Sequence, residues 1–136
     1  MIQRIQSVYL GLAAVALTGM LSTGVVFGSG PYTLWGTLTS AVLAILAAVG
    51  AIFMYSVRHK QRMVVVMAQL CTLLAAVILC GTLYLDDELY VHTHAGLEWD
   101  RLLTVTLPLC AYVLLILARR AITRDIKLVR SIDRLR

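Results

Sequence analysis

Four long stretches without a charged residue constrain this chain more than any other feature. They cover residues 8–27, 34–55, 63–85 and 102–118. The hydrocarbon core of a bilayer is about 30 Å thick, and a helix needs about 20 apolar residues to cross it. The fourth stretch has only 17 residues, but it can span because Arg119 and Arg120 can extend their side chains toward the headgroups. We therefore predict four membrane-spanning helices.

The composition agrees with a membrane protein. Hydrophobic residues make up 60% of the chain and charged residues 14%, whereas soluble domains average about 45–50% and about 25%. The stretches are too long and too uniformly apolar for barrel strands, so helices are the structure that satisfies every backbone amide in lipid. We predict an all-α, integral membrane four-helix bundle over residues 1–118 and a cytoplasmic amphipathic tail helix over residues 119–136.

The Lys and Arg residues predict the orientation. With four crossings, eleven of the twelve lie on one side: one before the first span, three between the second and third, and seven after the fourth. The positive-inside rule makes this side cytoplasmic, so both termini are expected inside the bacterial cytoplasmic (inner) membrane. A cleaved signal peptide is not expected, because the first stretch is longer than a signal core and no A-x-A site follows it.

Small residues predict how the first two spans pack. Helices in lipid associate through small side chains and a few hydrogen bonds. The first span has Ala14, Thr18 and Ser22 at intervals of four, and the second has Ser40 and Ala44 at the same interval. A short connection joins the two spans, so we expect a tight antiparallel hairpin.

Gln69 is the most polar side chain well inside a predicted span. A buried amide needs a partner, and Thr104 or Thr106 of the last span could supply one. Pro108 removes a backbone donor and leaves the carbonyl of Thr104 available. No Asp, Glu, Lys, Arg or His lies within a span, which argues against a coupled transporter. A small oligomeric transporter or channel, with its pore near Gln69, Thr104 and Pro108, remains an alternative.

Chemically reactive patterns are scarce. The chain has no G-x-S-x-G, P-loop, dinucleotide or H-E-x-x-H motif, so we expect a protein that is not an enzyme and has no cofactor. Cys71, Cys80 and Cys110 fall in apolar spans and are expected to be packing residues. His92 and His94 in the acidic outer loop are weak candidates for a metal site, which gives a second alternative, an outer-face metal-binding protein. An acidic, solvated loop explains the same residues.

The tail is basic and amphipathic, with two acids in an unusual place. At 100° per residue from Ile122, Asp125 falls at about 300° and Asp133 at about 20°, within the apolar arc and on either side of Val129. A carboxylate is tolerated better on a protein surface with a cationic partner than against anionic lipid. Arg58, Arg62 and Arg4 are available partners on the same side. Ion pairs within the tail and simple binding to the membrane surface remain open.

Two terminal motifs carry a resemblance. With its start "MIQRIQSVYL" (residues 1–10), four apolar spans and its end "DIKLVRSIDRLR" (residues 125–136), the chain resembles a family of uncharacterised short four-helix bacterial inner-membrane proteins, catalogued as a domain of unknown function. Members tend to have an acidic residue where this chain has Ile126. The resemblance implies a four-helix inner-membrane protein and supplies no activity, substrate or cofactor. It also implies that the tail forms one recognisable element, which includes Asp125, Leu128, Val129, Arg130, Ser131, Asp133, Arg134 and Arg136.

These observations lead to one main hypothesis. We expect a non-enzymatic accessory or interaction subunit that lies in the lipid bilayer and docks through its cytoplasmic tail on its own inner loop or on a protein partner. A homo-oligomer is an alternative form of that partnership, and no nucleic-acid partner is expected.

Overall fold

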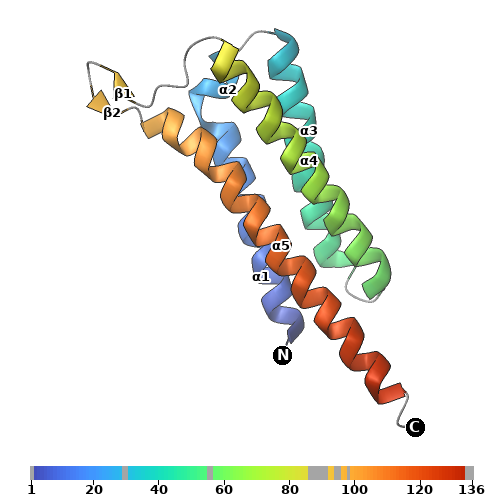
Figure 1. Cartoon of the computed structure of the whole chain (residues 1–136). Coiled ribbons are helices and arrows are strands. Elements are labelled where there is room, and N and C mark those ends of the chain that lie inside the picture. Colours follow the sequence, from blue (N-terminus) through green and yellow to red (C-terminus); the bar gives the residue numbers. More distant parts are fainter. Residues whose placement is uncertain are drawn as a thin grey trace.

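The computed structural model describes residues 2–28, 31–54, 57–85, 92–93, 96–97 and 99–133. These residues form the following elements in chain order: α1 (Ile2–Ser22), α2 (Gly24–Gly28), α3 (Pro31–Phe53), α4 (Arg58–Leu85), β1 (His92–Thr93), β2 (Gly96–Leu97) and α5 (Trp99–Asp133). Figure 1 shows the long helices side by side in one elongated bundle.

Helices α1, α3, α4 and α5 are each long and apolar enough to cross a membrane. This confirms the prediction of four candidate spans from the uncharged stretches. The helices continue past the apolar stretches at several ends, because Lys, Arg and Gln are good helix formers and no Gly or Pro interrupts them there. Helix α4 begins at Arg58 and α5 runs without a break from Trp99 to Asp133.

The first predicted span is divided in the structure. Helix α1 ends at Ser22, Thr23 forms a bend, and the short helix α2 begins at Gly24. Both the backbone nitrogen and the hydroxyl of Thr23 donate to the carbonyl of Met20, over 3.2 and 2.6 Å. These bonds close a tighter turn than an α-helix has, and Gly24 is a weak helix former at the same place. The apolar stretch is therefore continuous in the sequence, but in the structure it is divided between two helices.

The most extensive packing joins α3 with α4 and α1 with α5. Helix α1 also packs on α3, and α4 packs on α5, so the four long helices form a closed set of neighbours. Figure 1 shows both close pairs. The first two spans do pack on each other, but less extensively than α3 packs on α4 or α1 on α5.

The bundle core combines small residues from α3 with large ones from α1 and α5. Ala41, Ala44, Ala48 and Ala51 of α3 are fully buried, and Leu115 of α5 is a large buried side chain in the same cluster as the last three. Further large buried residues are Leu10, Leu17, Met20 and Ile122. The small side chains of α3 let neighbouring backbones approach closely.

The expected small-residue face of α1 is only partly at an interface. Ala14 is buried, but Thr18 and Ser22 are exposed. The hydroxyl of Thr18 donates to the carbonyl of Ala14, and that of Ser22 donates to the carbonyl of Gly19. These hydroxyls are satisfied within their own helix, so they do not need a partner helix.

The outer surface of the bundle is apolar. Large side chains that face away from the core include Val15, Leu46, Leu70 and Val113, all more than half exposed. A soluble protein rarely exposes so many apolar side chains in continuous rows. The exposed rows therefore match helices that are surrounded by lipid.

A small hairpin lies outside the helices. Strands β1 and β2 pair antiparallel, with His92 opposite Leu97 and Thr93 opposite Gly96. The fold class is helical as predicted, with these two short strands as an addition within the described residues.

Candidate functional site

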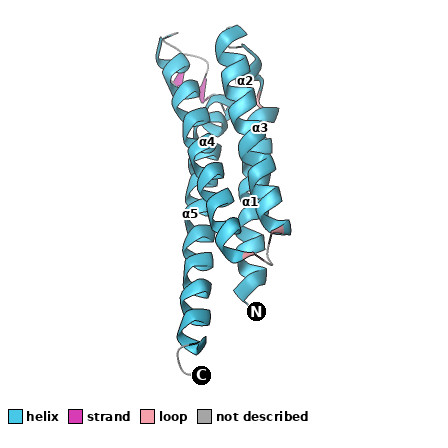
Figure 2. Cartoon of the chain, turned by 90° about the vertical axis from the view of Figure 1, so that its right-hand side faces the viewer, coloured by secondary structure: helices cyan, strands magenta, loops and turns pink. Residues whose placement is uncertain are grey.

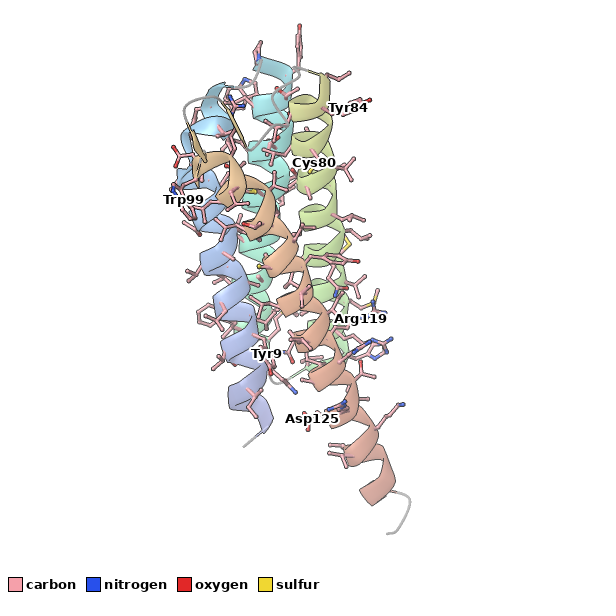
Figure 3. All side chains as sticks on the ribbon, turned by 60° about the vertical axis from the view of Figure 1, so that its left-hand side comes forward. Tyr9, Cys80, Tyr84, Trp99, Arg119 and Asp125 are labelled. Atoms are coloured by element: carbon pink, nitrogen blue, oxygen red, sulfur yellow. The ribbon has the colours of Figure 1, made fainter. Side chains whose placement is uncertain are left out.

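A basic cleft lies between α4 and α5. Its volume is about 590 Å³, and its lining residues are Arg62, Gln69, Tyr112, Ile116, Arg119, Arg120, Thr123 and Arg124. In Figure 3, Arg119 lies on the side of α5 that is next to α4. The cleft brings Arg62 of α4 beside three arginines of α5, which lie more than fifty residues later in the sequence.

The helical repeat explains why these residues share one wall. Six lining residues come from α5. After Tyr112, the other five follow at intervals of 4, 7, 8, 11 and 12, and these intervals return to the same side of a helix. On α4, Arg62 and Gln69 are separated by seven residues, two turns of the helix. Each helix therefore presents one stripe to the cleft.

Gln69 is the buried member of the lining. Only 6% of its surface is exposed, so the prediction of a buried amide is confirmed. Arg119 Nη1 donates to Gln69 Oε1 over 3.4 Å, which is long for a hydrogen bond. Gln69 Nε2 is buried and has no hydrogen-bond partner among the described residues. The amide therefore retains an unused donor.

The predicted partners of Gln69 are wrong. Thr104 lies fifteen residues before Arg119 on α5, which is about 22 Å along the helix. The antiparallel register of α4 and α5 places Gln69 beside the C-terminal half of α5, beyond the reach of Thr104 and Thr106. Gln69, Thr104 and Pro108 are therefore not brought to one point, although Thr104 and Pro108 are both fully buried in α5.

Thr104 instead joins α5 to the bend after α1. Its hydroxyl donates to Thr23 Oγ1 over 2.7 Å, and it also lies 2.6 Å from the carbonyl of Asp100. The hydroxyl of Thr106 donates to the carbonyl of Leu102 in its own helix. The bend at Thr23 is thus held by a side chain from a helix far away in the sequence.

The cleft offers hydrogen-bond donors and few acceptors. Its lining has four guanidinium groups and, among the described residues, no carboxylate. The Thr123 hydroxyl donates to the carbonyl of Arg119, which satisfies its proton within α5. A guanidinium group donates up to five hydrogen bonds and accepts none. The site is therefore suited to an anion with several acceptor oxygens.

Charge is unevenly distributed along the cleft. Tyr112 and Ile116 line the end nearer the middle of α5, while Arg120 and Arg124 lie nearer its C-terminus. The lining on α5 runs from Tyr112 to Arg124, twelve residue steps that rise about 18 Å along the helix. The cleft is therefore apolar toward the middle of the bundle and cationic toward the end that carries most of the basic residues.

The sequence predicts only part of this site. It indicates Gln69 as a buried amide and Arg62 as a partner for the tail, but it does not connect these residues with Tyr112, Thr123 or the arginines of α5. The spacing along α5 is visible in the sequence. Its place opposite Arg62 and Gln69 depends on the packing of α4 on α5, which the sequence does not show.

The predicted tail residues lie in the last part of α5. Ile126 packs against the core, whereas Leu128 and Val129 are 50% and 40% exposed. Asp125 is half-buried and is engaged in an interaction. The structure does not describe Arg134 and Arg136 or the following side chains: Arg4, Arg58, Arg130, Ser131 and Asp133. Docking of the tail on the inner loop stays a prediction.

The other predicted sites are spread over the fold. His92 lies in β1 and its side chain is outside the described part, as is all of His94. In the described ranges, no three His, Cys, Asp or Glu residues are close enough to hold a metal ion. Cys71 and Cys80 are half-buried, but Cys110 is exposed on the bundle surface, so it does not pack in the core as expected.

Four long apolar helices, an apolar outer surface and a basic cleft near one end define the class: a helical bundle whose four long helices could each cross a membrane. The chain belongs to the family described as a domain of unknown function (DUF4293), whose model matches residues 27–135. This confirms the resemblance that the terminal motifs indicated. Comparison with curated proteins and with solved structures gives no match.

Proposed function

We propose that this protein is a non-enzymatic interaction subunit of the bacterial cytoplasmic membrane, which binds a partner protein through the C-terminal part of α5. Its cationic end faces the cytoplasm, with both termini on that side. The lipid bilayer surrounds the four long helices. The proposal is supported most directly by the length of α5.

Helix α5 is longer than a membrane is thick. Its 35 residues extend about 52 Å, while the hydrocarbon core measures about 30 Å. If the span begins near Trp99, the last fifteen or so residues of α5 lie beyond the hydrocarbon. Figures 1 and 2 show this end of α5 passing beyond the N-terminal end of α1 and beyond the turn between α3 and α4.

The extension of α5 carries apolar side chains that are only partly covered. Leu128 and Val129 are exposed, and Lys127 is exposed beside them. An apolar strip bordered by charges on a helix that extends past its bundle is typical of a helix that docks in a groove of another protein. A structural role inside the bundle would instead have buried these side chains, as it does Ile122.

Site-specific photocrosslinking in living cells tests this proposal. A photoreactive phenylalanine analogue is placed at Leu128, and a matched control at Val113, which is exposed on the same helix but within the span. We expect a discrete protein adduct from position 128 and none from position 113. Asp125→Ala should weaken the adduct, because the acid lies one turn before the apolar strip.

Two results would contradict the proposal. Adducts from position 128 with lipid alone would show a helix that lies on the membrane surface. Adducts only between copies of this chain, together with a symmetric oligomer in mild detergent, would favour the transporter or channel alternative. Neither that alternative nor the metal-binding one is favoured by a specific contact in the described residues.

A further inference from the structure

We propose that the basic cleft between α4 and α5 binds the phosphate headgroup of an anionic phospholipid, with the lipid's acyl chains against the apolar wall of the cleft. The proposal rests on the membrane placement of the bundle and does not depend on the partner proposed for the end of α5.

Hydrogen-bond chemistry selects a phosphate. The cleft presents the guanidinium groups of Arg62, Arg119, Arg120 and Arg124, and its described lining contains no carboxylate. Arginines are strong binders of phosphate because their planar fork can donate two parallel bonds to its oxygens. An ammonium headgroup, as in a zwitterionic lipid, would place a further cation among these arginines.

Gln69 provides an independent observation that points to a missing acceptor. Gln69 lines the cleft, only 6% of its surface is exposed, and its Nε2 has no hydrogen-bond partner among the described residues. A buried donor without an acceptor is costly. The 3.4 Å bond from Arg119 is weak enough to exchange, so Arg119 can turn to a phosphate. Rotation of the amide would then direct its donor to the same anion.

The shape of the charge distribution favours a lipid over a soluble phosphate. Tyr112 and Ile116 form an apolar end, and Arg120 and Arg124 form a cationic end further toward the C-terminus. A phospholipid whose headgroup lies at the inner boundary has the same order along the membrane normal. Basic pockets between transmembrane helices on the cytoplasmic side are where anionic headgroups bind. A free phosphate ion would gain nothing from contact with the apolar half of the cleft, because it has no apolar part.

Thermal melting of the full chain in a mild nonionic detergent tests the proposal, with native mass spectrometry to count bound lipid. The additions are phosphatidylglycerol, phosphatidylcholine with the same acyl chains, and inorganic phosphate at millimolar concentration. A ligand that binds only the folded state raises Tm. We expect phosphatidylglycerol to raise Tm and to be retained in preference to phosphatidylcholine by about tenfold. Inorganic phosphate should have no more effect than sodium chloride at equal ionic strength.

Two double variants separate the cleft from general positive charge. Arg120→Gln with Arg124→Gln removes two exposed cations that line the cleft. Lys60→Gln with Lys127→Gln removes two exposed cations from the same helices outside it. We expect the first pair to abolish most of the preference for phosphatidylglycerol and the second pair to preserve it. Because all four side chains are exposed, neither pair should disturb folding.

Three outcomes would overturn the proposal. Equal retention of the two lipids would show that the cleft does not select an anion. Equal loss of preference in both double variants would show diffuse attraction to the protein's positive charge. A Tm rise with inorganic phosphate as large as that with phosphatidylglycerol would identify a soluble phosphate as the ligand.

Discussion

The hydroxyl pair of Thr104 and Thr23 joins α5 to the bend between α1 and α2. The oxygens are 2.7 Å apart, and both residues are buried. Hydrogen bonds between membrane helices contribute about 0.6 kcal/mol on average and about 1.7 kcal/mol at most. We expect Thr104→Val to lower the free energy of unfolding by about 1 kcal/mol, with most of that loss absent when Thr23→Val is already present. Unfolding in mixed micelles measures all four members of the double-mutant cycle.

Thr106 provides the control for this pair. Its hydroxyl donates within its own helix, to the carbonyl of Leu102 over 2.8 Å. The cycle of Thr23→Val with Thr106→Val should therefore show no coupling. If Thr23→Val and Thr106→Val were coupled as strongly as Thr23→Val and Thr104→Val, the coupling energy would not report a direct bond between Thr23 and Thr104.

At the same scale, the sequence predicted which polar side chain is buried but not what it contacts. Within an apolar span, an amide side chain faces either lipid or the other helices. Facing lipid is costly because lipid offers it no hydrogen-bond partner, so the apolar sequence around Gln69 is enough to predict its burial. Its partner depends on the offset between α4 and α5 along the bundle. The long connection between them, residues 86–98, leaves that offset free, and Arg119 rather than a threonine lies opposite Gln69.

Among the elements, α3 and α4 are fastened at their turn by one side chain. Gln61 in the first turns of α4 is 3% exposed, and its Nε2 donates to the carbonyl of Ala51 over 3.0 Å. The last carbonyls of a helix lack partners within it, and Ala51 belongs to the last turn of α3. We expect Gln61→Leu to lower the free energy of unfolding by about 1–2 kcal/mol. Gln61→Glu should cost more, because a carboxylate cannot donate.

The neighbouring position checks that this loss is specific. Lys60 is exposed at the same turn, so Lys60→Leu changes hydrophobicity there without removing a bond to α3. Its unfolding free energy should stay near that of the wild type, as measured by thermal melting in detergent. If Lys60→Leu lowered the free energy of unfolding as much as Gln61→Leu does, the loss in both variants would come from helix α4 itself and not from the bond to α3.

The sequence predicted the existence of the four long helices better than it predicted where they begin and end. The uncharged stretches predicted four helices because length and apolarity are sufficient for a span. They did not predict the bend at Thr23, since every residue near it is uncharged and only the weak helix propensity of Gly24 marks the place. They also did not predict that α1 packs most extensively on α5, because small residues occur on several faces of the spans.

Across the whole molecule, the two ends of the bundle differ in chemistry. Tyr84 and Trp99 lie at one end, and Arg119 and Asp125 lie toward the other, as Figure 3 shows. Both aromatic side chains are mostly exposed, as rings at a membrane interface are. The charge counts of the sequence predicted this asymmetry, whereas the cleft that gathers part of the charge required the packing of α4 on α5.

This asymmetry predicts the orientation, which reporter fusions can measure. By the positive-inside rule we expect the end with Arg62, Arg119 and Arg120 to be cytoplasmic. We expect green fluorescent protein fused after Arg136 to fluoresce, and alkaline phosphatase inserted after Gly30 to be active, since the enzyme needs disulfides that form only outside the cytoplasm.

Charge substitution makes the orientation test sharper. Replacing Arg58, Lys60 and Arg62 by Gln removes the basic residues between the second and third spans and should raise the fraction of inverted molecules, because these residues lie within a few positions of two spans. Removing the single outer arginine, Arg101→Gln, should not invert the chain. If alkaline phosphatase fused to the C-terminus of the unaltered protein were active, the cleft would not face the cytoplasm. The lipid proposed to bind there would then not come from the inner leaflet.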